Sequence, residues 1–120
     1  MYKLLTQEER EFLSIIEPYR TYDSEEKLLP STPTEIKEIW CLFRIKGVLE
    51  DCDGYIPSDM YKVKKLYCQL KNISGEDYDI FYKSLNCEKI ENMFNESIEK
   101  FIKERFPKRM HSTTNIISTI

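Results

Sequence analysis

The chain has 120 residues, of which 41% are hydrophobic, and a formal net charge of −3 at neutral pH. A chain of this length makes about one domain and can bury a core without a metal or a disulfide. The start MYKLLTQEEREF does not resemble a signal peptide, and no apolar run approaches the roughly 18 residues that a membrane span needs. We therefore expect a cytoplasmic protein with no membrane contact.

Residue usage also bears on the origin of the gene and on the cysteines. Alanine is absent, whereas isoleucine, lysine and tyrosine, which have AT-rich codons, are abundant, so we expect an AT-rich genome such as that of a phage or virus. Cysteines stand at positions 41, 52, 68 and 87, without a Cys-x-x-Cys pair, and the one histidine is His111. This spacing favours four reduced, mostly buried thiols and no zinc site.

The first half of the chain predicts two helices. Thr6 and Glu9 form a capping-box pattern for a helix over 7–17, and Thr32 with Glu35 forms another, with Pro33 at the first helical position. The second helix, about 33–50, contains IWCLF at 39–43, which is apolar around the whole circumference and has to be surrounded. We expect it to be the central helix, with Trp40 and Phe43 as the largest contributions to the core.

The stretch EDCDGYIPSD at 50–59 is compatible in composition with a metal loop, a hairpin or a connection. A calcium loop fails, because placing Gly54 at its sixth position puts Leu49 first and Met60 last. We expect a connection with a short extended segment near 54–57, in which Tyr55 and Ile56 lie against the central helix. Ser58 is then the cap of the following helix.

Three further helices are predicted at 59–71, 75–85 and 88–106. The last of them places on one side the apolar residues Ile90, Phe94, Ile98, Phe101 and Ile102. Ser74 with Asp77 repeats the capping-box pattern, and Asn86 is placed to cap the last helix. The sequence thus predicts an all-α fold: a compact single-domain bundle of about five helices over 1–107, followed by a loose C-terminal tail over 108–120.

Catalytic groups are scarce. With one histidine and three isolated glycines, neither a nucleophile–histidine pair nor a phosphate-binding loop is expected. The sequence predicts a protein that is not an enzyme and that uses no catalytic residue, cofactor or metal.

Charge is unevenly distributed. Acids outnumber bases over 1–59, and bases outnumber acids over 60–120, with the sharpest basic cluster at the end of the last helix. Helix-dipole complementarity and solubility account for such a cluster without a ligand. As contacts for a nucleic acid or an acidic partner, the candidate residues are Lys62, Lys64, Lys65, Lys100, Lys103, Arg105, Lys108 and Arg109.

Residues 39–85 run from IWCLF through DGYIP to DIFYKSL, as a buried helix, a connection, a helix, a turn and another helix. This order resembles the winged-helix amino-terminal domains of phage and plasmid replication initiators, and the resemblance implies DNA binding. The helix in the recognition position, however, carries Glu76, Asp77 and Asp79, which phosphates repel.

Two functions follow as hypotheses. The favoured one is a small non-catalytic protein–protein interaction module, such as an inhibitor or adaptor encoded by a phage or virus. The alternative is a winged-helix-like nucleic-acid-binding domain related to replication initiators.

Overall fold

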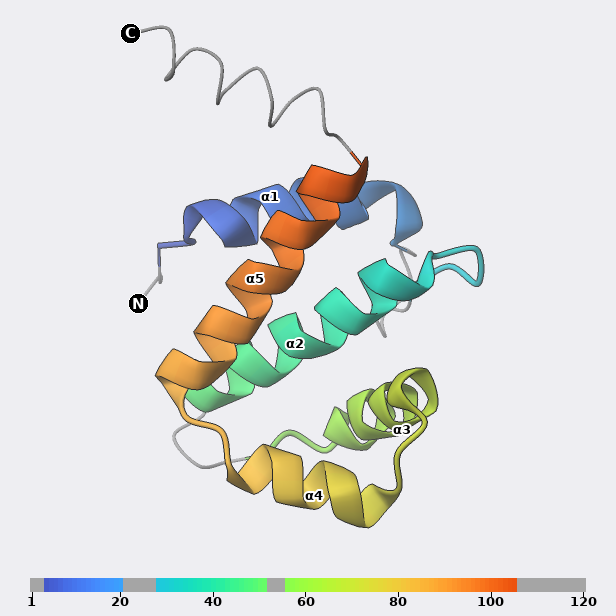
Figure 1. The fold of residues 1–120 in the computed structure, drawn as a ribbon, viewed down its shortest axis with the longest axis vertical. Helices are drawn as coiled ribbons and strands as arrows, with labels where there is room; N and C mark the ends of the chain where they lie inside the picture. Colours follow the sequence, from blue (N-terminus) through green and yellow to red (C-terminus); the bar gives the residue numbers. More distant parts are fainter. Residues whose placement is uncertain (1–3, 21–27, 52–55, 106–120) are drawn as a thin grey trace, which may run out of the picture.

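The computed structural model describes residues 4–20, 28–51 and 56–105. These residues form five α-helices, confirming the all-α class (Figure 1). A 3₁₀ turn, Glu17–Tyr19, follows the first helix, and Arg20 and Leu28 make an isolated bridge. The helices are α1 (Gln7–Ile16), α2 (Thr34–Asp51), α3 (Met60–Lys71), α4 (Gly75–Lys83) and α5 (Cys87–Arg105).

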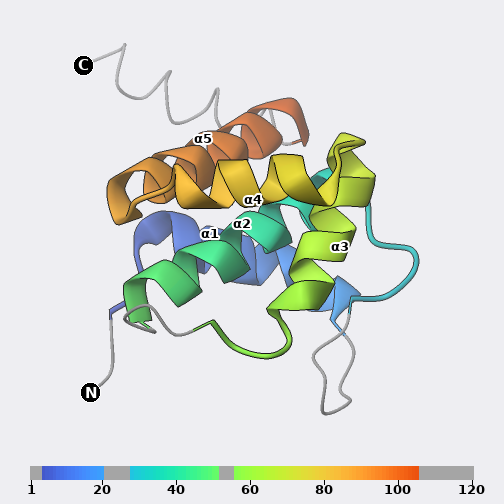
Figure 2. The ribbon, with the colours of Figure 1, turned by 90° about the horizontal axis from the view of Figure 1, so that it is seen from below.

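Helix α2 lies at the centre, as predicted. It packs against α5 on one side and α3 on another, while α1 packs against α5 and α4 against α3 (Figure 1). Seen from below, α3 and α4 cross at a steep angle (Figure 2).

The core has two aromatic groups. Phe12, Phe43 and Phe94 bring α1, α2 and α5 together, with ring centroids 5.2 to 5.8 Å apart. Tyr67 of α3 stacks on Phe81 of α4 at 5.2 Å. Aromatic pairs at these separations add to the stabilisation that burial provides. The predicted inward residues of α5 are all buried, namely Ile90, Phe94, Ile98, Phe101 and Ile102.

Three of the predicted helix caps are confirmed. The Thr6 hydroxyl accepts a hydrogen bond from the Glu9 amide at 3.1 Å, and the Glu9 carboxylate accepts one from the Thr6 amide at 2.9 Å. Ser74 and Asp77 form the same capping box at α4. The Asn86 side chain accepts a hydrogen bond from the Lys89 amide at 2.8 Å, which satisfies an otherwise free donor at the start of α5.

Two predicted caps are wrong. The Thr32 hydroxyl donates to the Leu29 carbonyl at 2.6 Å instead of capping α2, which begins at Thr34. Helix α3 begins at Met60, and the residue before it is Asp59, whose side chain makes no cap hydrogen bond. The Thr32 hydroxyl has a turn carbonyl as its competing partner. Ser58, the predicted cap of α3, lies two positions before the helix, and the Asp59 carboxylate that directly precedes the helix pairs with Arg44 of α2.

The connection before α3 also differs from the prediction. Ile56 is 56% exposed, so it does not lie against α2. The residues 52–55, including Tyr55 and half of the predicted extended segment, lie outside the described residues, as does the predicted tail at 108–120.

Burial of the IWCLF segment is less complete than predicted. Ile39, Cys41 and Leu42 are buried, but Trp40 and Phe43 are only partly buried against the core. The apolar pattern predicted the helix correctly. However, the elements around α2 do not completely cover its two largest side chains, Trp40 and Phe43. The thiols differ as well: Cys41 is buried, Cys68 is partly exposed and Cys87 is exposed, and all three are reduced.

Candidate protein-binding groove

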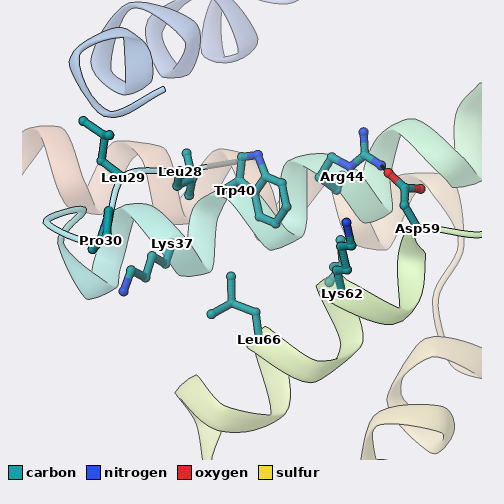
Figure 3. Close-up of a pocket in the computed structure, with 10 residues that line it drawn as sticks. Leu28, Leu29, Pro30, Lys37, Trp40, Arg44, Asp59, Lys62 and Leu66 are labelled. Carbon is teal, nitrogen blue, oxygen red and sulfur yellow. Dashed lines mark hydrogen bonds and ion pairs between the residues drawn. The ribbon is translucent and has the colours of Figure 1, made fainter. Parts of the chain in front are cut away.

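A hollow of about 290 Å³ opens between α2, α3 and the segment that precedes α2 (Figure 3). We call it the Trp40 groove, because the indole of Trp40 lies at its centre. Its lining residues are Leu28, Leu29, Pro30, Lys37, Trp40, Arg44, Asp59, Lys62, Val63 and Leu66.

Helical spacing explains which side chains meet in the groove. Lys37, Trp40 and Arg44 follow one another at intervals of three and four and so share one face of α2. Lys62 and Leu66 are four apart and share one face of α3. The groove is therefore built mainly by two helix faces that the fold sets opposite each other.

The polar and apolar parts of the groove are separated. Trp40 lies between Leu28 and Leu66 in the middle, Lys37 lies toward one end, and Arg44, Lys62 and Asp59 lie toward the other (Figure 3). The result is an apolar centre with a lysine near each end.

Arg44 is held in place by two contacts. Its Nη2 donates to Asp59 Oδ2 at 2.7 Å, and its guanidinium lies 6.0 Å from the centre of the Trp40 ring. Such a position over an indole face is a favourable cation–π arrangement. The Nε of Arg44 is buried and has no hydrogen-bond partner within the described structure. The ion pair with Asp59 therefore leaves the Nε donor of Arg44 without a hydrogen bond in the described structure.

Trp40 has open space on its other side as well. A second hollow, of about 220 Å³, lies between α1 and α2 and is also lined by Trp40, together with Phe12, Phe43 and Leu28. An indole bordered by two hollows makes fewer contacts than a side chain enclosed by a core. This arrangement accounts for the incomplete burial of Trp40.

The sequence-predicted basic residues of α3 fall in different environments. Lys62 lines the Trp40 groove. Lys64 forms an ion pair with Asp79 of α4 at 3.0 Å and lies 5.8 Å from the Tyr78 ring. Lys65 is exposed. Only the first of the three therefore belongs to the groove.

The predicted basic residues of α5 meet the acidic start of α2. Arg105 pairs with Glu35 at 3.0 Å and lies 5.7 Å from the Phe101 ring, and Lys100 lines a hollow that also contains Glu35 and Glu38. Lys103 is exposed. Since the partners of α5 are on α2 and those of Lys64 are on α4, the structure does not join the two sets into one surface. Lys108 and Arg109 lie outside the described residues.

Sequence reasoning did not identify the groove. Lys37 and Arg44 were not among the predicted contacts, and Trp40 was assigned to the core. One signal was available, because Lys37-x2-Trp40-x3-Arg44 puts two cations and an indole on a single helix face. Leu66 has no comparable local signal, since only the crossing of α3 over α2 brings it to Trp40.

A buried ion cluster between α1 and α2 was also not predicted from the sequence. Lys46 is 1% exposed, and its Nζ lies 3.2 Å from Glu9 and 3.0 Å from Glu50. Burial alone would lower the pKa of Lys46, but its hydrogen bonds to Glu50 and Glu9 raise that pKa above 10.5. Lys46 is therefore charged at neutral pH and ties α1 to α2. Its pairing with Glu50 was visible as an i,i+4 spacing.

The thiol of Cys41 lies deeper than the groove. It is fully buried, and its Sγ donates to the carbonyl oxygen of Val63 at 3.9 Å. Burial, with a smaller contribution from Glu38, raises the pKa of Cys41 to about 12. A thiol with such a pKa is unreactive at neutral pH.

Two findings limit what else the described residues could do. Across 4–20, 28–51 and 56–105, no three histidine, cysteine, aspartate or glutamate side chains gather closely enough to hold a metal ion. None of the helices in this part of the chain is long and apolar enough to cross a membrane.

The fold and groove define an all-α domain with a cationic, apolar-centred surface hollow. No family model, curated protein or solved structure matches the chain. The function proposed below therefore rests on the chemistry of the groove.

Proposed function

We propose that this protein is a small non-catalytic protein-interaction module that holds a segment of a partner protein in the Trp40 groove. The observation that carries the proposal is the placement of the chain's one tryptophan, which is partly exposed in an apolar hollow instead of enclosed in the core. Tryptophan and arginine are the residues most enriched where protein interfaces concentrate their binding energy, and here they are adjacent.

The composition of the groove supports binding in preference to catalysis. Its lining contains neither histidine nor any hydroxyl or thiol side chain, so it offers no serine–histidine or cysteine–histidine pair. A volume of about 290 Å³ is at the small end of the range of about 300 to 1,000 Å³ that small-molecule sites occupy. One or two side chains of a protein partner suit it better than a cofactor does.

The setting of such a module is part of the proposal. The alanine-free, isoleucine- and lysine-rich composition is typical of AT-rich genomes, among them those of phages and viruses. An inhibitor or adaptor encoded by such a genome needs only a stable fold and one binding surface, which a single domain of this size can provide.

Nucleic-acid binding receives less support from the described residues. Glu76, Asp77 and Asp79 are exposed on α4, the helix in the recognition position. Lys64 and Arg105 already have carboxylate partners. A nucleic acid would have to displace those partners and overcome the repulsion of α4, both of which lower its affinity.

Panning a random peptide library against the full chain tests the proposal. Enriched peptides are titrated into the protein while the emission of Trp40 is recorded, and they are compared on Leu66→Glu, which changes the groove, and Gln69→Glu, an exposed position on the same helix. We expect peptides that shift the emission, bind the Gln69 variant normally and lose affinity for the Leu66 variant. Peptides that bind both variants equally, or failure to enrich any peptide, would contradict the proposal.

A further inference from the structure

We propose that a second hollow, between α3 and α4, binds a quaternary ammonium group of the kind that choline and trimethylated lysine carry. The hollow has a volume of about 310 Å³ and shares no lining residue with the Trp40 groove. Three tyrosines line it, Tyr61, Tyr78 and Tyr82, together with Met60, Lys64 and Asp79. We call it the tyrosine hollow. The inference is independent of the function proposed for the groove.

The tyrosine hollow lies on the far side of α3 from the Trp40 groove. Tyr61 and Lys64 line the hollow, whereas Lys62 and Leu66 line the groove. At about 3.6 residues per turn, the two pairs lie roughly 150° apart around the helix axis, on nearly opposite faces. Helix α4 crosses α3 on the hollow's side and supplies the other two tyrosines (Figure 2).

An ammonium group of the chain itself already lies in this hollow. Lys64 Nζ donates a hydrogen bond to Asp79 Oδ1 at 3.0 Å and lies 5.8 Å from the centre of the Tyr78 ring. The negative face of an aromatic ring attracts a cation at such a distance. The hollow therefore combines a carboxylate with an aromatic face, which are the two groups that stabilise an ammonium ion, and Lys64 shows that a cation fits between them.

The aromatic walls of the hollow differ in mobility. Tyr78 is 5% exposed, and its ring packs against those of Tyr67, Phe81 and Tyr82, with ring centroids 5.9 to 6.2 Å apart. Burial raises the pKa of Tyr78, so its side chain is a neutral phenol at neutral pH. Tyr61 is 64% exposed and free to adjust to a ligand. A cation in the hollow thus meets a fixed ring on α4 and an accessible ring on α3.

A quaternary ammonium group is suited to replace the ammonium of Lys64. The side chains of Lys64 and Asp79 are 39% and 55% exposed, and an ion pair as exposed as this contributes little to stability. A lysine ammonium is strongly hydrated, whereas methyl groups make a quaternary ammonium apolar at its surface, so it loses less on leaving water. One cation replaces another beside Asp79, and the exchange therefore requires no unpaired charge in the hollow.

Three small molecules test the inference by NMR titration of the full chain. They are choline, a blocked trimethyllysine, and the uncharged alcohol in which carbon replaces the nitrogen of choline. We expect both cations to shift the backbone amide signals of Tyr61 and Asp79, and the alcohol to bind at least about threefold more weakly than choline. The tighter of the two cations identifies the source of the ligand, a choline compound or a methylated protein.

Removing the internal ammonium gives the sharper prediction. Lys64→Met should bind choline about three- to fivefold tighter than the parent, because the ligand no longer displaces a lysine from Asp79. The matched control is Lys65→Met, an equal change at an exposed neighbour that does not line the hollow, and it should bind as the parent does. Circular dichroism of both variants confirms that each is folded.

A pair of changes at Tyr61 tests the aromatic contribution. Tyr61→Phe keeps the ring and should retain choline binding, whereas Tyr61→Leu keeps an apolar side chain without the ring and should bind about threefold more weakly. The exposure of Tyr61 makes both changes tolerable to the fold.

Four results would overturn the inference. Equal affinity for choline and the uncharged alcohol would show that the hollow does not recognise a cation. Unchanged or weaker binding in Lys64→Met would show that the ligand does not take the place of Lys64. Equal losses in the two Tyr61 variants would remove the aromatic ring from the site. Signals that move around Trp40, or no signals that move at all, would leave the tyrosine hollow without this ligand.

Discussion

The two sides of α2 differ in how completely a large aromatic side chain is buried there. Toward α5, Phe94 is fully buried and its ring contacts Phe12 and Phe43 at 5.7 and 5.8 Å. Trp40 is only partly buried, since it borders the groove of about 290 Å³ toward α3 and a hollow of about 220 Å³ toward α1. The same apolar helix therefore closes a core on one side and leaves an open groove on the other, depending on which side chains its neighbours supply.

The largest effect is expected from the buried ion cluster on the closed side. Lys46→Ala should lower the free energy of unfolding by about 3 to 5 kcal/mol, because it removes the buried cation that lies 3.2 Å from the buried carboxylate of Glu9. Guanidinium denaturation measures the loss. The double variant Glu9→Gln with Lys46→Met, which removes both charges, should lose less. A loss below about 1 kcal/mol in Lys46→Ala would show that water reaches this cluster.

Truncating one aromatic on each side compares the two directly. Phe94→Ala should cost about 3 to 5 kcal/mol, the usual range for a large aromatic in a packed core. Trp40→Ala should cost less, about 2 kcal/mol, since the indole already borders open space and gives up fewer contacts. Urea unfolding of both variants provides the numbers. Equal losses would mean that the groove is closed in solution.

Smaller losses of stability are expected from changes at the starts of α5 and α3. Asn86→Ala should cost about 1 kcal/mol, because its side chain accepts the hydrogen bond of the Lys89 amide at the start of α5. Ser58→Ala, next to the groove, should change stability by only a few tenths of a kcal/mol, since no cap hydrogen bond precedes α3. Thermal melts of the two variants check this order, and a reversed order would contradict the cap assignments.

The smallest expected effect on stability is absent at neutral pH and appears only in alkali. Burial raises the pKa of Cys41 from 9.0, and that of Tyr67 from 10.0, to about 12 in each case. The unfolded chain thus loses these protons first, so stability should stay constant up to about pH 9 and fall as the pH rises toward 12. Denaturant titrations across this range measure the fall. An unchanged stability at pH 11 would show that the layer beneath the groove is open to solvent.

The sequence predicted the parts of the fold that depend on local patterns. Five helices, the inward face of α5 and the caps at Thr6, Ser74 and Asn86 all follow from spacing and side-chain chemistry within a few residues. The cap at Thr32 failed because the Leu29 carbonyl is a competing partner for its hydroxyl. The cap at Ser58 failed because α3 begins at Met60, so that Asp59, which pairs with Arg44, precedes the helix.

Less of the candidate site could be predicted from the sequence. An apolar run shows that a helix has neighbours on several sides, but not that the neighbours leave a gap around Trp40. The pairing of Lys46 with Glu9 spans 37 positions, and the meeting of Trp40 with Leu66 depends on how α3 crosses α2. Both are consequences of packing, which no local spacing encodes.

One measurement tests the central claim most directly, namely that the Trp40 groove is the binding surface. The chain has a single tryptophan, so its NMR spectrum has a single indole N–H signal to follow during titration with a peptide enriched from the library. We predict that this signal moves together with the backbone amides of Lys37 and Leu66, while those of α5 stay in place. An unmoved indole signal, with changes concentrated around Lys100 and Lys103, would contradict the account and transfer the binding site to the basic end of α5.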